Sequence, residues 1–254
     1  MILAFSINVN ELFDFKPLFK IGSLGITFPH VLLFAVTVGL IWFFTVAFAR
    51  PKLVPVGAQN VAELFVDFVR EQIAVPVLGP LAQNWVPFLT LMFYFVLFLN
   101  VLSVIPGVQF PVTSLAGIPV VLALLSWIIY NAVGIKEQGL GPYFKGIAFP
   151  PGVPKVIYVI LTPIELFSTI IVRPITLGLR LMANMMAGHI LLAVIFSGTW
   201  IFIHGNFFGK VGFVLPFSLG LVLTGFEIFV AGMQAFIITI LTAVYIAGAA
   251  HPEH

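Results

Sequence analysis

The amino-acid sequence predicts an all-α polytopic membrane protein with about five transmembrane helices and one amphipathic surface helix. Hydrophobic residues make up 61% of the 254 residues and charged residues only 8%, whereas ordinary globular proteins contain about 25% charged residues. Several apolar segments reach or exceed the roughly 20 residues that a helix needs to cross a bilayer. The 28 phenylalanines support the same fold class, because lipid tolerates them on a protein surface and water does not.

The composition also argues against several classes of function. The chain has no cysteine, which excludes disulfides, thiol chemistry and cysteine metal sites. A net charge of +2 without any basic run gives no indication of nucleic-acid binding. The sequence contains no zinc-protease, phosphate-loop or serine-triad motif. We therefore expect a chain that is non-catalytic by itself and has no cofactor or metal.

The predicted elements form a single membrane domain over residues 1–254, which begins with an interfacial segment at residues 1–28. The first predicted span covers residues 29–49. The other four predicted spans cover residues 86–106, 118–135, 156–202 and 211–249. The last two spans are longer than a perpendicular crossing requires, and the loop around His204–Lys210 between them is short. We therefore expect these two spans to form a long, tilted, antiparallel hairpin.

Residues 56–75 predict an amphipathic helix between the first two spans. Its charged residues fall on one side of a helix, and its apolar residues fall largely on the other. The charged set is Glu63, Asp67, Arg70 and Glu71, and the apolar set is Val61, Leu64, Phe65, Phe68 and Val69. Such a helix lies on the membrane surface or against a partner. A loop helix that only joins two spans is the alternative.

The positive charges predict the orientation of the chain. Cytoplasmic loops of membrane proteins carry an excess of lysine and arginine. Six basic residues lie in loops on one side of the predicted membrane: Arg50, Lys52, Arg70, Lys136, Lys145 and Lys155. Lys16, Lys20 and Lys210 lie on the other side. We therefore expect an external N-terminus and a cytoplasmic C-terminus.

Arg180 is the most informative residue, because an arginine at the centre of a membrane helix costs roughly 2.5–3.5 kcal/mol even on an insertion scale. Thr176, Arg180 and Asn184 follow one another at steps of four, so they form one polar ridge on a helix. Arg173 shares this stripe and is interpreted as a snorkelling or structural residue. His189 lies half a turn away from the ridge. Small residues between these positions allow a neighbouring helix to approach.

The fifth predicted span carries a second polar stripe, formed by Glu227, Gln234 and Tyr245. If the hairpin turns near residue 207, residues at equal depth have numbers that sum to about 414, because both helices rise equally per residue. The level pairs are then Arg180 with Gln234, His189 with Glu227, and Thr169 with Tyr245.

This arrangement suggests proton chemistry. A histidine beside a glutamate inside a membrane can take up and release protons, since histidine titrates near neutrality. Glu165, about 22 Å from Arg180 by the helical rise, forms a second titratable site with Tyr245 toward the cytoplasm. Arg180 stays cationic at physiological pH, so it cannot relay a proton and it repels hydronium. Two vestibules separated by a fixed charge are two half-channels that need a mobile carboxylate on a partner. A static His189–Glu227 ion pair that fixes helix packing is the alternative.

The segment TLGLRLMANMMAGH at Thr176–His189, with Arg173 and Pro174 before it and QAFIITILTAVY at Gln234–Tyr245 after it, resembles subunit a of the F-type ATP synthase. The resemblance covers the chain from about Val86 onward and the preceding surface helix. It implies a proton-conducting stator subunit in a bacterial plasma membrane. The implied partners are a c-subunit ring, the b subunits of the peripheral stalk and the remaining ATP synthase subunits. In that family an arginine, here Arg180, faces the rotating ring and separates two aqueous half-channels.

The resemblance also implies a proton path. Asn184, His189, Glu227 and Gln234 would conduct a proton from outside to a ring carboxylate, and Glu165 and Tyr245 would line the inner exit. Some bacterial members carry the acid on the fourth span and the histidine on the fifth, so this chain resembles the reverse arrangement. Ser103 stands where some members carry an aspartate. The interval from Glu165 to Pro174 is one residue longer than in some relatives.

Two other functions stay open at this point. A self-contained cation/proton antiporter predicts inverted repeats and discontinuous helices in both halves, and the sequence shows no internal repeat. In a purely structural membrane subunit, the polar stripes would serve assembly alone. The titratable histidine favours H⁺ over Na⁺ as the transported ion.

Overall fold

The structure, a computed structural model, describes residues 17–21, 24–105, 108, 110–149, 157–204 and 212–250. Within these residues, five helical segments are long and apolar enough to cross a membrane: Phe28–Phe48, Ala58–Val101, Gly117–Gln138, Tyr158–Ile203 and Val214–Ala250. The all-α polytopic fold predicted from the sequence is therefore confirmed. The predictions for residues 1–16 and for most of the loop after His204 lie outside the described residues.

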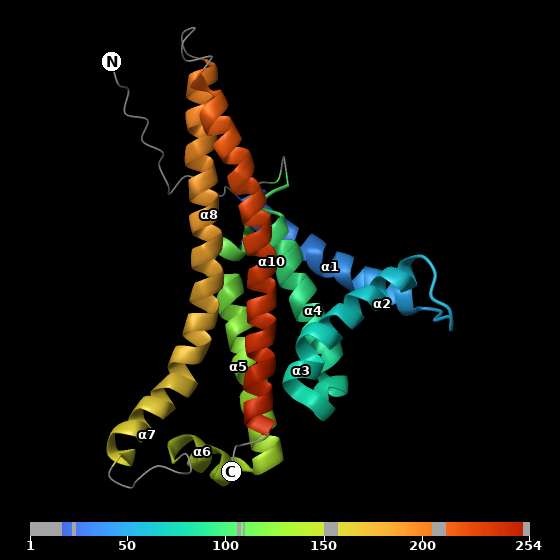
Figure 1. Ribbon diagram of the computed structural model, residues 1–254, viewed down its shortest axis with the longest axis vertical. Coiled ribbons are helices and arrows are strands. Elements are labelled where there is room, and N and C mark those ends of the chain that lie inside the picture. The colour runs from blue at the N-terminus through green and yellow to red at the C-terminus, as the bar shows by residue number, and fades with distance from the viewer. Residues whose placement is uncertain are drawn as a thin grey trace.

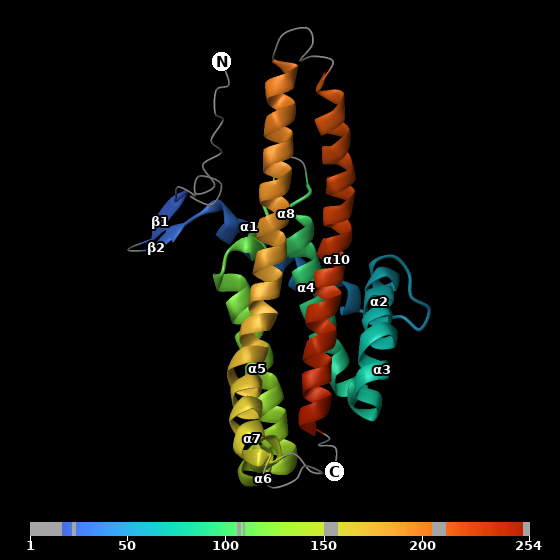
Figure 2. The ribbon, with the colours of Figure 1, turned by 60° about the vertical axis from the view of Figure 1, so that its left-hand side comes forward.

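Helices α8 (Arg173–Ile203) and α10 (Val214–Ala250) form the long axis of the molecule. They run side by side in both ribbon views (Figures 1 and 2) and pack against each other. A helix of 37 residues is about 55 Å long. Since the hydrocarbon layer of a bilayer is only about 30 Å thick, α10 must tilt or project beyond it. The predicted antiparallel hairpin of the last two spans is confirmed.

The N-terminal part of the described chain contains a short antiparallel strand pair, β1 (Phe19–Ile21) and β2 (Leu24–Ile26). The sequence predicts an interfacial segment here, and the strand pair is an addition to the predicted all-α fold. Helix α1 (Phe28–Phe48) follows and packs against α2 and α4. Phe34, Ile41 and Trp42 of α1 are exposed, and an apolar surface of this kind is expected to face lipid or a partner.

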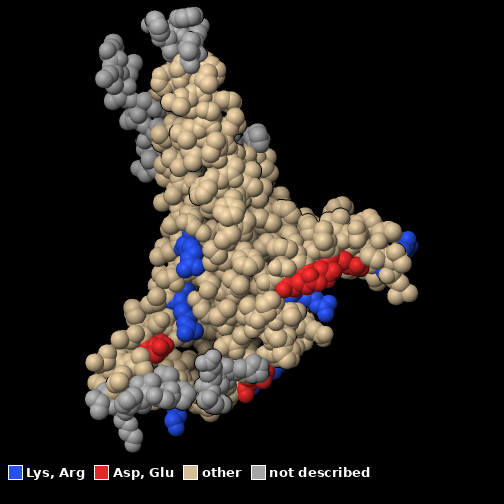
Figure 3. Space-filling view, viewed as in Figure 1, with Lys and Arg blue, Asp and Glu red and all other residues tan. Residues whose placement is uncertain are grey.

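The predicted amphipathic helix corresponds to α2 (Ala58–Val69), which continues without a break into the second span. The connection is a π-helical turn η2 (Arg70–Ala74), α3 (Val75–Leu78) and a 3₁₀ turn η3 (Gly79–Leu81). Ala62, Val69 and Ile73 are buried because this face packs on α1 and α4. The acidic residues of α2 and η2 are Glu63, Asp67 and Glu71. The space-filling view of Figure 3 shows a continuous stripe of acidic atoms on this face of the molecule.

Helix α4 (Ala82–Val101) is displaced from the predicted span at residues 86–106. It begins earlier because Gln83 and Asn84 extend the helix beyond the apolar segment, and hydropathy marks only the part of a helix suited to lipid. It ends earlier because the chain tightens into a turn. In that turn the N–H of Ser103 donates to the carbonyl of Asn100 at 3.1 Å, and the N–H of Val104 donates to that of Val101 at 3.0 Å.

Helix α5 (Gly117–Gln138) ends at Gly139, whose φ of 85° lies in the left-handed region that favours glycine. The chain then forms α6 (Leu140–Ala148), which the sequence analysis took as loop. Tyr143 anchors α6, because its ring lies over Gly134 and its hydroxyl donates to Oδ1 of Asn131 at 3.0 Å. Gln138 donates to the carbonyl of Ala249 at 2.7 Å, which ties α5 to the end of α10.

The predicted span at residues 156–202 is helical but not uniform. Helix α7 (Tyr158–Phe167) leads into a π-helical turn η5 (Ser168–Val172) before α8 begins. Figure 1 shows that α7 departs from the direction of α8 and lies near α6. The hydroxyl of Thr162 donates to the carbonyl of Ala148 at 2.6 Å and joins α7 to α6.

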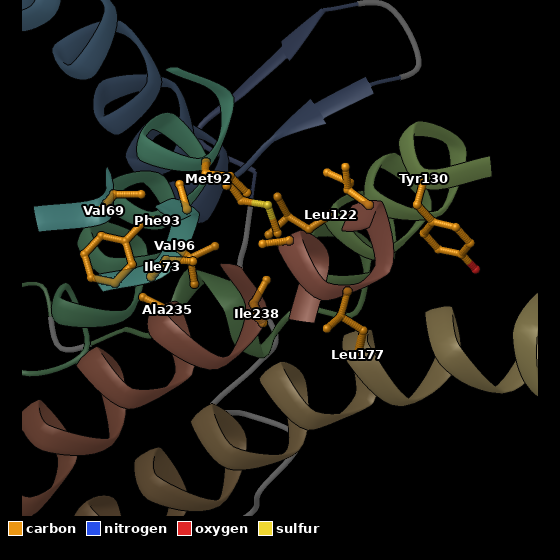
Figure 4. Packing of buried hydrophobic residues seen from close by; sticks show 14 of the residues in the cluster. Val69, Ile73, Met92, Phe93, Val96, Leu122, Tyr130, Leu177, Ala235 and Ile238 are labelled. Atoms are coloured by element: carbon orange, nitrogen blue, oxygen red, sulfur yellow. The ribbon is translucent and has the colours of Figure 1, made fainter. Parts of the chain in front are cut away.

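The core lies where α2, η2, α4, α5, α8 and α10 meet, and Figure 4 shows its side chains converging from these elements. The labelled residues are Val69, Ile73, Met92, Phe93, Val96, Leu122, Tyr130, Leu177, Ala235 and Ile238. Within a membrane such a core is held by close van der Waals packing and hydrogen bonds between helices, because lipid is as apolar as the side chains.

We expect Gly134→Ala to weaken the packing of α6 on α5. A Cβ atom at position 134 would overlap the ring of Tyr143, and overpacking of this kind lowers stability by about 1–3 kcal/mol. Thermal denaturation of the protein in detergent measures the effect. Gly146→Ala is the control, because a Cβ there meets no atom within 4 Å. An unchanged denaturation midpoint for Gly134→Ala would contradict the described contact.

Candidate functional site

The polar ridge Thr176–Arg180–Asn184 lies on the outer surface of α8. All three residues are exposed, and so are the small residues Ala183 and Ala187 beside them. Figure 3 shows basic atoms at two places along this side of the molecule. Among the described residues, the guanidinium of Arg180 has no ion-pair partner. The ridge therefore presents an unneutralised cation on a surface that another helix can approach closely.

Packing on a different side of α8 explains why the ridge faces outward. Leu177, Leu181 and Met185 are buried at steps of four, against α5 and α10. Gly178 packs closely against α5, because a Cβ atom added at position 178 would lie only 3.2 Å from the carbonyl oxygen of Pro119. The rotation of α8 is thus set by an apolar side and a glycine contact, and the ridge occupies the side that this packing leaves free.

Glu227 is buried on α10, with 4% of its surface exposed. Its carboxyl group packs on Gly188 of α8, because a Cβ atom at that glycine would lie 3.2 Å from Oε1. The neighbouring His189 has its ring edge-on to Phe110, with 5.8 Å between the ring centroids. The structure therefore brings Glu227 to the depth of His189. It also shows that Gly188, one of the small residues expected to let a neighbouring helix approach, provides the space for the carboxyl group.

Polar residues from α4 and the segment after it surround this position. The Ser103 hydroxyl is close enough to the Glu227 carboxyl group to interact with it, although no hydrogen bond of good geometry joins them or engages either carboxyl oxygen among the described residues. The side-chain amide of Asn100 donates to the carbonyl of Ala231 at 3.3 Å. Its Oδ1 accepts a 2.6 Å hydrogen bond from Thr113. We call Asn100, Ser103, Thr113, His189 and Glu227 the outer cluster.

From the sequence, Ser103 is notable only as a substitution for an aspartate, and the sequence predicts no role for Asn100 or Thr113. The signal for Asn100 was present, because a polar amide inside an apolar span needs a buried partner. Its partner, the Ala231 carbonyl, is 131 residues away along the chain. Thr113 carried no comparable signal, because it lies in a short connection between two spans.

Gln234 is buried on the same side of α10 as Glu227, with 4% of its surface exposed. Its amide oxygen has no hydrogen-bond partner among the described residues. Arg180, predicted at the same depth, is exposed on α8. Among the described residues, no hydrogen bond joins the two side chains.

A group of aromatic residues lies at the other end of the α8–α10 contact. The guanidinium of Arg173 lies over the ring of Tyr245, 5.2 Å from its centroid, a distance typical of cation–π contacts. Tyr130 of α5 has its ring 5.5 Å from that of Tyr245, and its hydroxyl donates to the carbonyl of Thr169 at 2.7 Å. Arg173, Tyr130, Thr169 and Tyr245 form what we call the inner cluster. Glu165 is half-buried in α7, before the turn that leads into α8.

Tyr245 contacts a residue that the sequence does not pair with it. The sequence predicts a second titratable site formed by Glu165 with Tyr245, and this stays a prediction; the cation that lies over the Tyr245 ring is Arg173. Arg173 was interpreted as a snorkelling or structural residue, and its aromatic contact supplies a structural reason for its position. The expected equal depth of Thr169 and Tyr245 agrees with the geometry, since both contact Tyr130.

Comparisons with known proteins identify the family. A family model described as ATP synthase A chain matches residues 30–247. A protein from Frankia alni named ATP synthase subunit a is 46% identical over 87% of this chain and 75% of its own length. A protein of the same name from Rhodococcus erythropolis is 44% identical over 83% of this chain and 78% of its own. One from Streptomyces lividans is 34% identical over 95% and 86%.

The match extends from α1 almost to the end of α10 and includes every residue of the ridge, the outer cluster and the inner cluster. On this match, and on its similarity to relatives that it covers over most of their length, the chain belongs to the ATP synthase A chain family.

Proposed function

We propose that this protein is a proton-conducting stator subunit of an F-type ATP synthase. In this role it provides two offset half-channels to a rotating c-ring, with Arg180 as the barrier between them. The chain would be non-catalytic by itself and would form one membrane domain. The observation that carries the proposal is the exposed, unneutralised guanidinium of Arg180, set between two polar clusters at different depths along the same helix.

The outer cluster is the proposed entry half-channel. Its acid, Glu227, is buried and has carboxyl oxygens that no hydrogen bond among the described residues occupies. These oxygens remain able to accept a proton and pass it on. His189 lies next to Gly188, on which the carboxyl group packs. A proton arriving by way of Asn184, His189, Glu227 and Gln234 would neutralise a carboxylate of the ring.

The ridge is the proposed surface for the c-ring. A carboxyl group of the ring can enter lipid once it is protonated, because transferring the neutral group from water costs far less free energy than transferring the charged carboxylate. The exposed Ala183 and Ala187 would let a ring helix approach the backbone of α8. Arg180 would attract a ring carboxylate that has lost its proton and would repel protons that bypass the ring. Since one charge crossing 100 mV is worth about 2.3 kcal/mol, such a barrier preserves the energy of the gradient.

The inner cluster is the proposed exit. Glu165 is half-buried in α7, next to the turn that carries the chain into α8. Arg173 is held on Tyr245 and supplies a second positive charge on this side. A proton released from the ring would leave toward Glu165, with Tyr245 lining the path.

The charge distribution supports a C-terminus in the cytoplasm. Gln138 at the end of α5 bonds to Ala249 near the end of α10, so Lys136 and the C-terminal end of α10 lie at the same end of the molecule. Helix α6 with Lys145 follows directly. By the positive-inside rule this end faces the cytoplasm of a bacterial plasma membrane, and the N-terminus lies outside. The b subunits of the peripheral stalk and the remaining ATP synthase subunits are the other proposed partners.

We expect Arg180→Ala to abolish ATP-driven proton pumping in inside-out vesicles that contain the assembled complex. The physical reason is the loss of the only permanent charge on the ridge, which orders ring carboxylates and blocks leakage. Acidification of the vesicle interior, followed with a pH-sensitive dye, measures the effect. Arg70→Ala is the control, because Arg70 is an exposed arginine outside the two clusters. Pumping by Arg180→Ala at the rate of the unmodified complex would refute the proposed mechanism.

We expect Glu227→Gln to stop pumping while the complex still assembles, because glutamine keeps the shape of the side chain but cannot take up and release a proton.

Gly188→Ala tests the same position by reducing the space available to the Glu227 carboxyl group. Its added Cβ would lie 3.2 Å from Oε1 of Glu227, so pumping should slow. Gly198→Ala in the same helix is the control, because a Cβ there meets nothing within 4 Å. Equal pumping rates for the two alanine variants would show that the carboxyl group does not depend on this contact.

A further inference from the structure

The π-helical turn η5 contains a competition between two carbonyl groups for one donor. The backbone N–H of Arg173 donates to the carbonyl of Ser168, five residues earlier. In an uninterrupted α-helix the same N–H would donate to the carbonyl of Thr169, four residues earlier. The choice between these two acceptors decides whether the turn is π-helical or α-helical.

The π-helical choice leaves the Thr169 carbonyl without a donor from its own helix. In a π-helical turn its donor would be residue 174, which is a proline and has no N–H. Thr169 is buried, with 3% of its surface exposed, and a buried carbonyl without a partner is unfavourable. The hydroxyl of Tyr130 supplies the missing hydrogen bond at 2.7 Å.

Tyr130 is well placed to hold this carbonyl. It lies on α5 and is only 2% exposed. Its ring contacts Tyr245 of α10, and the same Tyr245 ring carries the guanidinium of Arg173. The position of the Tyr130 hydroxyl is thus fixed by α5, which carries it, and by the contact of its ring with α10. Arg173, the first residue of α8, contacts the same Tyr245 ring.

The π-helical turn determines the rotation of α7 about its own axis relative to α8. Such a turn holds one residue more than an α-helical turn, so every residue of α7 is displaced by one position relative to α8. One position corresponds to a rotation of about 100°. In an uninterrupted helix, Leu166 would occupy the place that Glu165 occupies in the structure.

We propose that Tyr130 is a positioning residue, whose hydrogen bond to the Thr169 carbonyl stabilises the π-helical turn and thereby gives Glu165, rather than Leu166, its rotational position relative to α8. This inference rests on the proposed function, in which Glu165 lines the inner half-channel. It assigns a role to a tyrosine for which the sequence alone predicts none.

The absence of cysteine from the natural sequence allows a direct test. Glu165→Cys and Leu166→Cys are introduced separately, and the complex is kept in inside-out membrane vesicles. The probe is a membrane-impermeant sulfonatoethyl methanethiosulfonate, which reacts fastest with thiols that face water. With Tyr130 present, the cysteine at position 165 should react faster than the cysteine at position 166. Faster reaction at 166, or no reaction at either position, overturns the proposal.

Tyr130→Phe should then lower the ratio of the reaction rate at position 165 to that at position 166 by about tenfold, the factor expected from losing one hydrogen bond. Tyr143→Phe is the matched control. Tyr143 is also a buried tyrosine near this end of α5, but its hydroxyl donates to the Asn131 side chain. An unchanged ratio in Tyr130→Phe, or an equal change in Tyr143→Phe, overturns the proposal.

Deletion of the exposed Ile171 from η5 provides a rescue. In the Tyr130→Phe background this deletion removes the extra residue of the turn, so an α-helix returns position 165 to its original place. The ratio should recover. If both positions are labelled equally fast in Tyr130→Phe and the deletion does not restore the ratio, the substitution has loosened the packing of α7 in general. That result would overturn the proposal.

The labelling ratio does not depend on proton pumping, so the two proposals can fail separately. An unchanged labelling ratio in Tyr130→Phe would refute the role of Tyr130 without bearing on the half-channels. Normal pumping by Arg180→Ala would refute the half-channel mechanism without bearing on the register of η5.

Discussion

The rotation of α8 about its own axis is the constraint on which the rest of the structure depends. Leu177, Leu181 and Met185 are buried on one side, and the glycine contact with Pro119 holds α8 close to α5. Because interlocking side chains determine how two helices pack, these contacts also decide where Arg180 points. The rotation that buries three apolar residues brings a costly charge to a surface where a carboxylate of a partner can neutralise it.

The two ends of the helix pair are held by different kinds of contact. At the outer cluster, Glu227 packs on a glycine and its carboxyl oxygens are not engaged in hydrogen bonds among the described residues. At the inner cluster, an aromatic ring holds Arg173, and a tyrosine hydroxyl holds a backbone carbonyl. The first arrangement leaves a titratable group available for proton transfer. The second arrangement fixes the positions of Arg173 and of the Thr169 carbonyl relative to α5 and α10.

Helix α10 is the scaffold that both clusters share. The buried side of α10 carries Glu227 and Gln234. Tyr245 lies near the C-terminal end of the same helix. The same helix packs against α4, α5 and α8, and its backbone accepts side-chain hydrogen bonds at Ala231 and Ala249. A shift of α10 along its axis would therefore alter both clusters together. In the proposed function, this coupling would keep the depth of the entry half-channel and that of the exit half-channel in a constant relation.

The sequence by itself determined the features that depend on local spacing or composition. The steps of four from Thr176 through Arg180 to Asn184 identified the exposed ridge, because helical periodicity is a local property. Counting from the hairpin turn brought Glu227 to the level of His189, because both helices are regular over that interval. Only the tertiary structure decided the π-helical turn, the contact of Arg173 with Tyr245 and the positions of Asn100 and Ser103. The reason is physical: each depends on a partner from another helix, such as the Tyr130 hydroxyl 39 residues from Thr169, and no local pattern encodes that distance.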